Sequence, residues 1–171
     1  DRTSWVLRRN DITFVVTGAL GPDSEIAQHV HEHGDGVKDI AFLVDDARSS
    51  FAETTKRGAR PALEPVDLDG GEDGVLRRSA VYTYGSVRHS FVDRTDYHGV
   101  FAPGFRKVKK PAAAAGGLNL LEIDHAVGNV ALGDMNRFVD FYRDVFGFAQ
   151  LIHYDDKVIH TEYSALMSKV M

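Results

Sequence analysis

Short segments of the chain carry apolar residues in two different patterns. In some, β-branched and aromatic residues cluster or alternate with polar ones, which is typical of β-strands. In others, apolar residues recur three and four positions apart, which is typical of a helix with one buried face. The N-terminal part is predicted to contain strands over 4–9 and 12–17, a helix over 24–33, a strand over 37–44, a helix over 47–57 and one or two strands over 79–93. The C-terminal part is predicted to contain a strand over 119–127, a helix over 134–146 and strands over 149–154 and 160–170.

Residues that favour turns and helix ends separate these elements. Asn10 and Asp11 lie between the first two strands and predict a hairpin. Gly58 and Gly147 follow two of the predicted helices, where a glycine commonly ends the helix. Residues 61–74 contain two prolines, three glycines and five acidic residues, so this stretch is predicted to be a loop.

A change of composition divides the chain. Residues 98–118 combine two prolines, four glycines, an alanine run and four basic residues, which is typical of an interdomain linker. We therefore expect one domain over 1–98, a linker over 99–118 and the start of a second domain over 119–171. The predicted order is ββαβαβ before the linker and βαββ after it, and we expect a fold of the α+β class. The basic residues of the linker are interpreted as a solvated connection: Arg106, Lys107, Lys109 and Lys110.

Composition narrows the possible chemistry. The chain has no cysteine, so a metal ion must be bound by His, Asp or Glu. Twenty Lys and Arg against 25 Asp and Glu leave a net charge of −5, which disfavours general nucleic-acid binding. No apolar run is long enough to cross a membrane, and no export signal is visible, so we expect a cytoplasmic protein. The chain starts at Asp1 and stops within a strand-like pattern, so we expect a piece of a longer protein.

Three histidines cluster at the end of the first predicted helix. His29 and His33 are four residues apart and share a helix face, which is a possible geometry for two metal ligands. His31 lies between them, and the spacing of a helical zinc motif is absent. We interpret the cluster as a solvated helix end, where cationic side chains interact favourably with the helix dipole.

An acidic stretch within 61–74 has partial similarity to a calcium loop. Asp67 and Asp69 have the required spacing, but Gly71 and Glu72 stand where a further acid and the obligatory glycine are needed. We therefore interpret it as a solvated loop.

His125 differs from the other histidines in its surroundings. It alternates with Ile123 and Val127 along one face of the strand predicted over 119–127. A histidine among apolar residues must find a hydrogen-bond partner or stay neutral. The pattern leaves two interpretations open, a satisfied core histidine or a metal ligand held on a rigid strand.

Several longer motifs carry a resemblance to a known family. IDHAVGNV, LGDMNRFVDFYRDVFGF and TEYSALMSKV in the C-terminal part resemble the 4-hydroxyphenylpyruvate dioxygenase family of the vicinal oxygen chelate superfamily. HGDGVKDIAFLVDD and VYTYGSVRHSFVDR resemble the N-terminal domain of the same family. The resemblance implies tandem βαβββ modules, both incomplete in this chain. Residues 1–98 then correspond to part of the N-terminal domain, and residues 119–171 to the start of the C-terminal, iron-binding catalytic domain.

The resemblance also implies a site. The family binds one Fe(II) through two histidines and one glutamate, and the first of these corresponds to His125. The other two ligands are expected beyond Met171. Val127 and Ser168 are expected to line the substrate pocket, and no catalytic residue is expected besides the metal ligand. Asp39 lies in a motif similar to one that carries a metal-binding histidine in the family. This chain has Asp at the histidine position, so the first domain is expected to hold no metal.

The implied activity is the conversion of 4-hydroxyphenylpyruvate and O₂ to homogentisate and CO₂ in tyrosine catabolism. The full-length family protein is expected to form homo-oligomers, and the present chain alone is expected to bind iron weakly and to be inactive. Two alternatives stay open. One is 4-hydroxymandelate synthase, which uses the same substrate and iron ligands. The other is a non-catalytic metabolite-binding module of the same fold.

Overall fold

The computed structural model describes residues 1–108, 118–154, 160–161, 164–165 and 168–171. The N-terminal elements are β1 (Arg2–Arg9), β2 (Ile12–Ala19), α1 (Glu25–His33), β3 (Asp39–Leu43), α2 (Ala47–Lys56), β4 (Pro61–Asp69), a short 3₁₀ turn (Gly71–Asp73), β5 (Val75–Tyr82) and β6 (Arg88–Asp93). The C-terminal elements are α3 (Met135–Asp144), β7 (Ile152–Tyr154), β8 (His160–Thr161), β9 (Ser164–Ala165) and β10 (Ser168–Val170).

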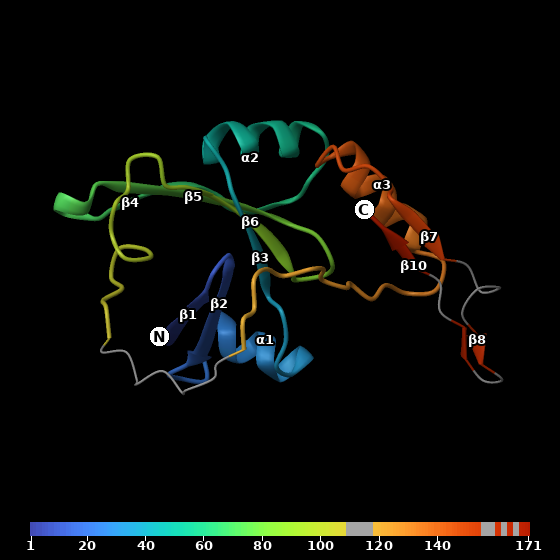
Figure 1. Cartoon of the computed structure of the whole chain (residues 1–171), viewed down its shortest axis with the longest axis horizontal. Helices are drawn as coiled ribbons and strands as arrows, with labels where there is room; N and C mark the ends of the chain where they lie inside the picture. Colours follow the sequence, from blue (N-terminus) through green and yellow to red (C-terminus); the bar gives the residue numbers. More distant parts are fainter. Residues whose placement is uncertain (109–117, 155–159, 162–163, 166–167) are drawn as a thin grey trace.

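The centre of the molecule is a complete βαβββ unit. The elements β3, α2, β4, β5 and β6 follow one another along the chain, and the sheet order is β3-β6-β5-β4. β3 and β6 pair in parallel, and the other neighbours are antiparallel. α2 covers one face of this sheet, and the β1–β2 hairpin lies on the opposite side (Figure 1). The predicted α+β class with βαβββ topology is therefore confirmed, whereas the expectation that both modules are incomplete is wrong for this unit.

The prediction of a loop over 61–74 is wrong, because β4 occupies the first nine residues of this stretch. Its two prolines, Pro61 and Pro65, lack the N–H that a central strand needs. β4 lies at the edge of the sheet, and its pairing with β5 shifts register on both sides of Leu63. Prolines are tolerated at such edges and bulges. This strand completes the βαβββ unit that the sequence pattern left without one strand.

The predicted hairpin and the first predicted helix are confirmed. β1 and β2 pair antiparallel over their whole length, with Asn10 in the turn at a φ of 47°. Asparagine adopts this left-handed conformation more readily than most residues. Ser24 caps α1 by accepting a hydrogen bond from the Ala27 N–H at 3.1 Å.

The main core lies between α2, the sheet and α3. It contains the buried residues Ala47, Phe51, Ala59, Val81, Phe91 and Val145. Phe51 of α2 faces the sheet, and Val145 follows the last turn of α3. The buried Ser79 hydroxyl of β5 donates to the Ala47 carbonyl at 2.8 Å and so ties the sheet to the start of α2. Because Val145 belongs to the segment predicted as the second domain, the core includes residues from both sides of the expected linker.

The C-terminal part is only partly as predicted. The helix over 134–146 is confirmed as α3, and Gly147 follows it at a φ of 74°. The strand predicted over 119–127 is wrong, because residues 118–131 are extended without a strand ladder. The single strand predicted over 160–170 is also wrong, because β8 and β9 pair antiparallel and β10 pairs with β7. Residues 109–117 of the expected linker, with Lys109 and Lys110, lie outside the described residues.

No helix in the described part of the chain is long and apolar enough to span a membrane.

Candidate functional site

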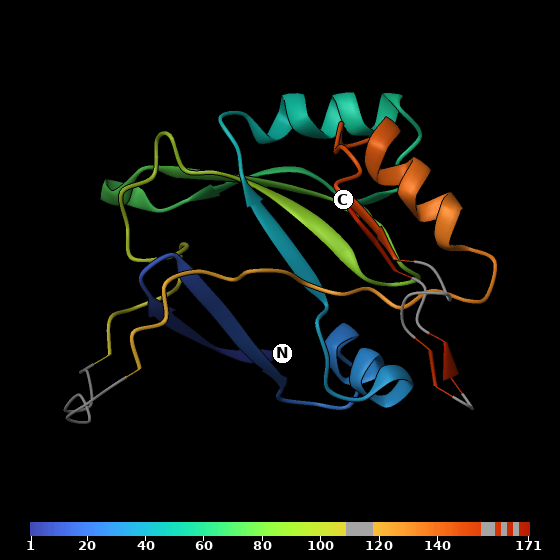
Figure 2. The ribbon, with the colours of Figure 1, turned by 45° about the vertical axis from the view of Figure 1, so that its right-hand side comes forward.

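The predicted iron ligand lies on the extended segment 118–131, which passes from the β1–β2 hairpin to α3 (Figure 2). This segment contacts the N-terminal part of the chain at two places. The Asp11 N–H donates to the Leu121 carbonyl at 3.1 Å, and the Asn10 side-chain amide donates to the Leu120 carbonyl. Further along, the Gly128 backbone lies against the ring of Tyr84 in the β5–β6 turn.

His125 is exposed, with 70% of its side chain accessible to solvent. It is therefore neither the satisfied core histidine nor the inward-facing strand residue that the alternating pattern suggested. Its Nδ1 atom forms a short hydrogen bond with the neighbouring Asp124 carboxylate. A neutral imidazole that donates its Nδ1–H keeps the Nε2 lone pair for a metal ion, and metal-bound histidines commonly have such a carboxylate partner. The donor chemistry of this pair thus fits one ligand position.

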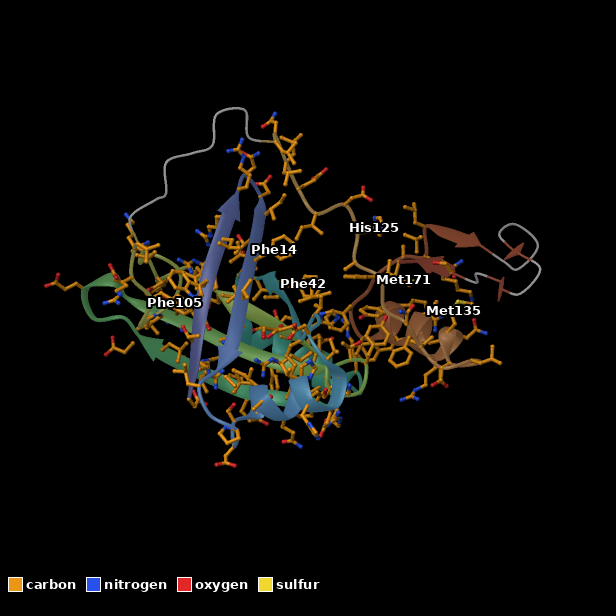
Figure 3. The ribbon with its side chains drawn as sticks, turned by 90° about the horizontal axis from the view of Figure 1, so that it is seen from below. Phe14, Phe42, Phe105, His125, Met135 and Met171 are labelled. Carbon is orange, nitrogen blue, oxygen red and sulfur yellow. The ribbon has the colours of Figure 1, made fainter. Side chains whose placement is uncertain are left out.

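The other two predicted site residues lie apart on the chain. Val127 is on the same extended segment as His125 and is 76% exposed. Ser168 is partly buried on β10, which pairs with β7 beside α3. Figure 3 shows His125 between the hairpin and α3, with Met171 at the end of β10.

Iron needs more ligands than the described residues supply. Among residues 1–108, 118–154 and the short described pieces beyond, no three His, Asp or Glu side chains form a group that could hold a metal ion. Within the described part of the chain, His125 therefore belongs to no such group, and its role as an iron ligand stays a prediction.

A buried hydrogen-bond chain connects α3 to the sheet. The imidazole of His89 on β6 is 3% exposed, and its Nδ1 lies 3.0 Å from the Ile40 carbonyl. Its Nε2 lies 2.8 Å from the Tyr142 hydroxyl of α3, which in turn lies 3.1 Å from the Thr83 hydroxyl. A neutral His89 satisfies all of these contacts if Nδ1–H donates to Ile40, Tyr142 donates to Nε2 and Thr83 donates to Tyr142.

Aromatic rings surround the hydrogen bonds of His89, and burial shifts the pKa values of His89 and Tyr84. Phe42, Phe146 and Tyr142 pack within 5.7 Å of the His89 ring centroid. Burial lowers the pKa of His89, although the hydrogen bond to Ile40 opposes the shift. Burial, followed by a hydrogen bond with Tyr142, raises the pKa of Tyr84. Both groups are therefore uncharged near neutral pH, as a desolvated contact between two elements requires.

Sequence reasoning did not identify this network. The weak signal was that His89 alternates with apolar residues on a predicted strand, and that Tyr142 lies on the apolar face of a predicted helix. Their partnership spans 53 residues and depends on the packing of α3.

Among the described residues, the histidine cluster on α1 forms no group of three side chains that could hold a metal ion. His29 is buried, whereas His31 and His33 are exposed, so the prediction of a solvated helix end is wrong for His29. The Ser86 hydroxyl lies 3.4 Å from His29 Nδ1 and 3.2 Å from His33 Nε2. The Lys38 ammonium donates to the Ser86 carbonyl at 2.9 Å, and a cation at this place disfavours a metal ion.

The acidic stretch belongs largely to a strand, and the described linker residues are exposed. Asp67 and Asp69 lie on strand β4 rather than in a loop. Asp67 pairs with Arg48 at 2.6 Å, and the Asp69 carboxylate accepts from the Gly71 N–H at 2.8 Å. Both carboxylates thus stabilise the fold instead of forming a calcium loop. Arg106 and Lys107 are exposed, in agreement with the prediction for the described part of the linker.

Asp39 has protein partners on both carboxylate oxygens. Arg88 Nε donates to Oδ2 at 2.8 Å, and the Ser90 hydroxyl donates to the same oxygen at 2.6 Å. The Ser90 N–H donates to Oδ1 at 3.1 Å. The Arg88 guanidinium therefore compensates the charge of this carboxylate, and the absence of a metal here stays an expectation.

The βαβββ unit defines the class of protein. It is the α+β architecture of the vicinal oxygen chelate superfamily, and the solved structures include a matching member of that superfamily. This relative is a mutant of 4-hydroxymandelate synthase from Streptomyces coelicolor, with a TM-score of 0.70 and 30% identity over 91% of this chain and 43% of its own chain. No protein-family model matches the chain.

Within this class, the chain is similar to 4-hydroxyphenylpyruvate dioxygenases over almost all of its length. The enzyme of Aspergillus fumigatus is 39% identical over 98% of this chain and 46% of its own length. The enzyme of Caenorhabditis elegans is 39% identical over 96% of this chain, and that of Danio rerio is 40% identical over 98%, each with 43% of its own length covered. The resemblance that the motifs indicated is confirmed. The chain spans less than half of the length of these curated relatives.

Proposed function

We propose that this chain is part of an Fe(II)-dependent dioxygenase that converts 4-hydroxyphenylpyruvate and O₂ to homogentisate and CO₂ in tyrosine breakdown. The observation that carries the proposal is the 36–40% identity to curated 4-hydroxyphenylpyruvate dioxygenases over at least 96% of the chain. Bound Fe(II) supplies the position at which the keto acid and O₂ meet in such a reaction. The atoms balance, because the CO₂ leaves with the carbon and both oxygens of the keto acid's carboxylate, and both atoms of O₂ enter homogentisate, one in its new carboxylate and one in its new ring hydroxyl.

In this proposal each predicted site residue has one role. His125 holds iron through Nε2, while Asp124 orients the ring from Nδ1. Val127 and Ser168 line the substrate pocket. His125 and Val127 are both exposed, so these roles rest on the motif match and not on a formed pocket.

The proposal includes a domain organisation. Residues 1–98 form part of the N-terminal domain, residues 99–118 connect the domains, and residues 119–171 begin the iron-binding domain. The core shared by Phe91, Phe51 and Val145 supports close packing between the two domains rather than a flexible separation. We also propose a cytoplasmic location and a homo-oligomeric full-length protein, as inferred from the sequence.

A second candidate is 4-hydroxymandelate synthase, because a structure of that enzyme matches this fold. The two activities share the substrate and differ in the carbon that is oxidised. The decisive test is chromatography of the products formed from 4-hydroxyphenylpyruvate by the full gene product that carries this chain. Homogentisate supports the proposal. Hydroxymandelate favours the second candidate, and neither product together with no bound iron favours a non-catalytic binding module.

A further inference from the structure

We propose that the N-terminal part of the chain positions the metal-binding histidine, by holding the backbone on both sides of His125. This inference rests on the proposed function, since it takes His125 to be the iron ligand. The two anchors are the β1–β2 turn, at Leu120 and Leu121, and Tyr84 of the β5–β6 turn, at Gly128. Both anchors belong to the part of the chain before the linker.

The first anchor is made by two consecutive residues of the hairpin turn. Asn10 donates through its side-chain amide to Leu120, and Asp11 donates through its backbone N–H to Leu121 at 3.1 Å. The left-handed conformation of Asn10, with a φ of 47°, belongs to the turn that presents these two donors. The extended segment has no strand ladder, so these hydrogen bonds fix its backbone at that end.

The second anchor is a close contact between Tyr84 and Gly128. A Cβ atom added at Gly128 would lie 2.7 Å from the Tyr84 ring, so an alanine there would force this ring or the segment to shift. The Tyr84 ring also packs on Phe138 of α3, with 4.5 Å between the ring centroids. Tyr84 therefore connects the sheet, the extended segment and α3 at one place.

The turn that carries Tyr84 is itself held firmly. Lys38 donates to the Ser86 carbonyl at 2.9 Å, and Arg60 donates to the Gly85 carbonyl at 3.0 Å. Within the turn, the Thr83 N–H donates to the Val87 carbonyl at 2.9 Å. A rigid turn is able to act as a reference point for a segment that forms no ladder of its own.

His125 lies between the two anchors, so fixing the backbone at both of them restricts the position of its side chain. Leu121 and Gly128 are seven residues apart, and His125 lies four residues after the first and three before the second. With both ends fixed, the imidazole has a restricted range of positions. Displacement of about 1 Å at a reacting centre costs on the order of a hundredfold in rate, so such restriction has functional value.

The composition of the chain suits a distance measurement. Trp5 is the only tryptophan and no cysteine is present, so one introduced cysteine is labelled uniquely. The exposed Asn129 is replaced by cysteine, and time-resolved energy transfer from Trp5 to a label at 129 gives the distribution of distances. We expect a narrow distribution in this parent and in its Tyr84→Phe variant, which keeps the ring. We expect a broad one in Tyr84→Ala.

A double-mutant cycle separates the contact from general destabilisation. Gly128→Ala should broaden or shift the distribution when Tyr84 is present and should have no further effect in the Tyr84→Ala background. Gly36→Ala is the matched control, because a Cβ there meets nothing within 4 Å. An unchanged narrow distribution in both Tyr84→Ala and Gly128→Ala overturns the proposal.

The functional consequence is measured in the full gene product. Tyr84→Ala should weaken Fe(II) affinity about 10- to 100-fold, the usual range for loss of a group that orients a ligand, and Tyr84→Phe should recover most of it. Unchanged iron affinity in Tyr84→Ala overturns the positioning role. If His125→Ala keeps its iron, the proposed function is wrong. The distance measurements on Tyr84 test the anchoring of the segment separately, because they do not depend on iron.

Discussion

Tyr142 contributes to stability through a single hydroxyl that bonds the buried His89 and the half-buried Thr83. Its oxygen lies within 3.1 Å of both His89 Nε2 and Thr83 Oγ1. In a desolvated site, a lost partner costs more than the hydrogen bond itself contributes, because the remaining polar groups stay buried without compensation.

Tyr142→Phe should therefore lower the free energy of unfolding by about 1–3 kcal/mol. Urea denaturation followed by circular dichroism measures the change. Tyr82→Phe is the control, because the Tyr82 ring keeps its contact with the Arg60 guanidinium, 3.7 Å from its centroid. Equal losses in the two variants would show that the network has no special contribution.

His89 makes stability depend on pH in a defined direction. Its pKa is lowered by burial from an ordinary value of 6.5, so below that pH the unfolded chain binds a proton that the folded chain resists. The free energy of unfolding should be constant with respect to this group above about pH 6.5, decrease as the pH falls from 6.5 toward the lowered pKa, and level off below that pKa. The slope from one such group is at most about 1.4 kcal/mol per pH unit.

The measurement is a series of urea denaturation curves between about pH 7 and pH 5. His89→Gln should show a smaller slope than the parent, whatever its absolute stability. His31→Gln, at an exposed position on α1, should keep the parent slope. Parallel pH profiles for the parent and His89→Gln would contradict the account of this histidine.

At the scale of elements, α2 depends on one large side chain. Phe51 is 8% exposed and packs in the core with Val81 and Phe91 of the sheet. The start of the helix is fixed separately by Asp46, which accepts hydrogen bonds from the Arg48 and Ser49 N–H groups. The Phe51 side chain is therefore the main contact of this helix with the core.

Phe51→Ala should cost about 3–5 kcal/mol, the usual range for truncating a buried phenylalanine. The exposed Ala52→Ser on the same helix should change stability by less than about 0.5 kcal/mol. Thermal and urea unfolding of both variants test this prediction. A loss below about 1 kcal/mol in Phe51→Ala would show that α2 is not held by the core as described.

Local sequence signals predicted the elements that local interactions determine. The turn residues Asn10 and Asp11 define the hairpin, and the apolar stripe ending at Gly147 defines α3. β4 was missed because Pro61 and Pro65 indicate a loop, whereas the edge of a sheet tolerates them. The strand over 119–127 was wrongly predicted because alternating apolar and polar residues show only that a segment is suited to a sheet. A strand also needs a partner, and in the described part of the chain no strand pairs with this segment.

The candidate site was predictable in identity but not in surroundings. His125 was singled out by its motif, whereas its solvent exposure and its anchors at Asn10 and Tyr84 depend on contacts more than 40 residues away. Residue pairs this far apart leave no periodic signal in a single sequence. The same reason explains why the partnership of His89 and Tyr142 was missed.

At the scale of the whole molecule, we propose that this chain supplies one iron ligand, His125, of the three that the family resemblance implies. One imidazole in a solvated position competes poorly with water for Fe(II), because chelation by several ligands normally provides the affinity. The 171-residue chain by itself should therefore bind Fe(II) weakly and consume no O₂ with 4-hydroxyphenylpyruvate. An oxygen electrode and isothermal titration with Fe(II) test this, and turnover by the isolated chain would refute it.

The most direct test of the central claim is the iron content of the full gene product with and without the His125 imidazole. The parent and the exposed-surface control His31→Ala should each bind one equivalent of Fe(II). His125→Ala should lose the iron while its circular dichroism spectrum stays unchanged. Stoichiometric iron in a folded His125→Ala protein would contradict the claim that this residue is a metal ligand.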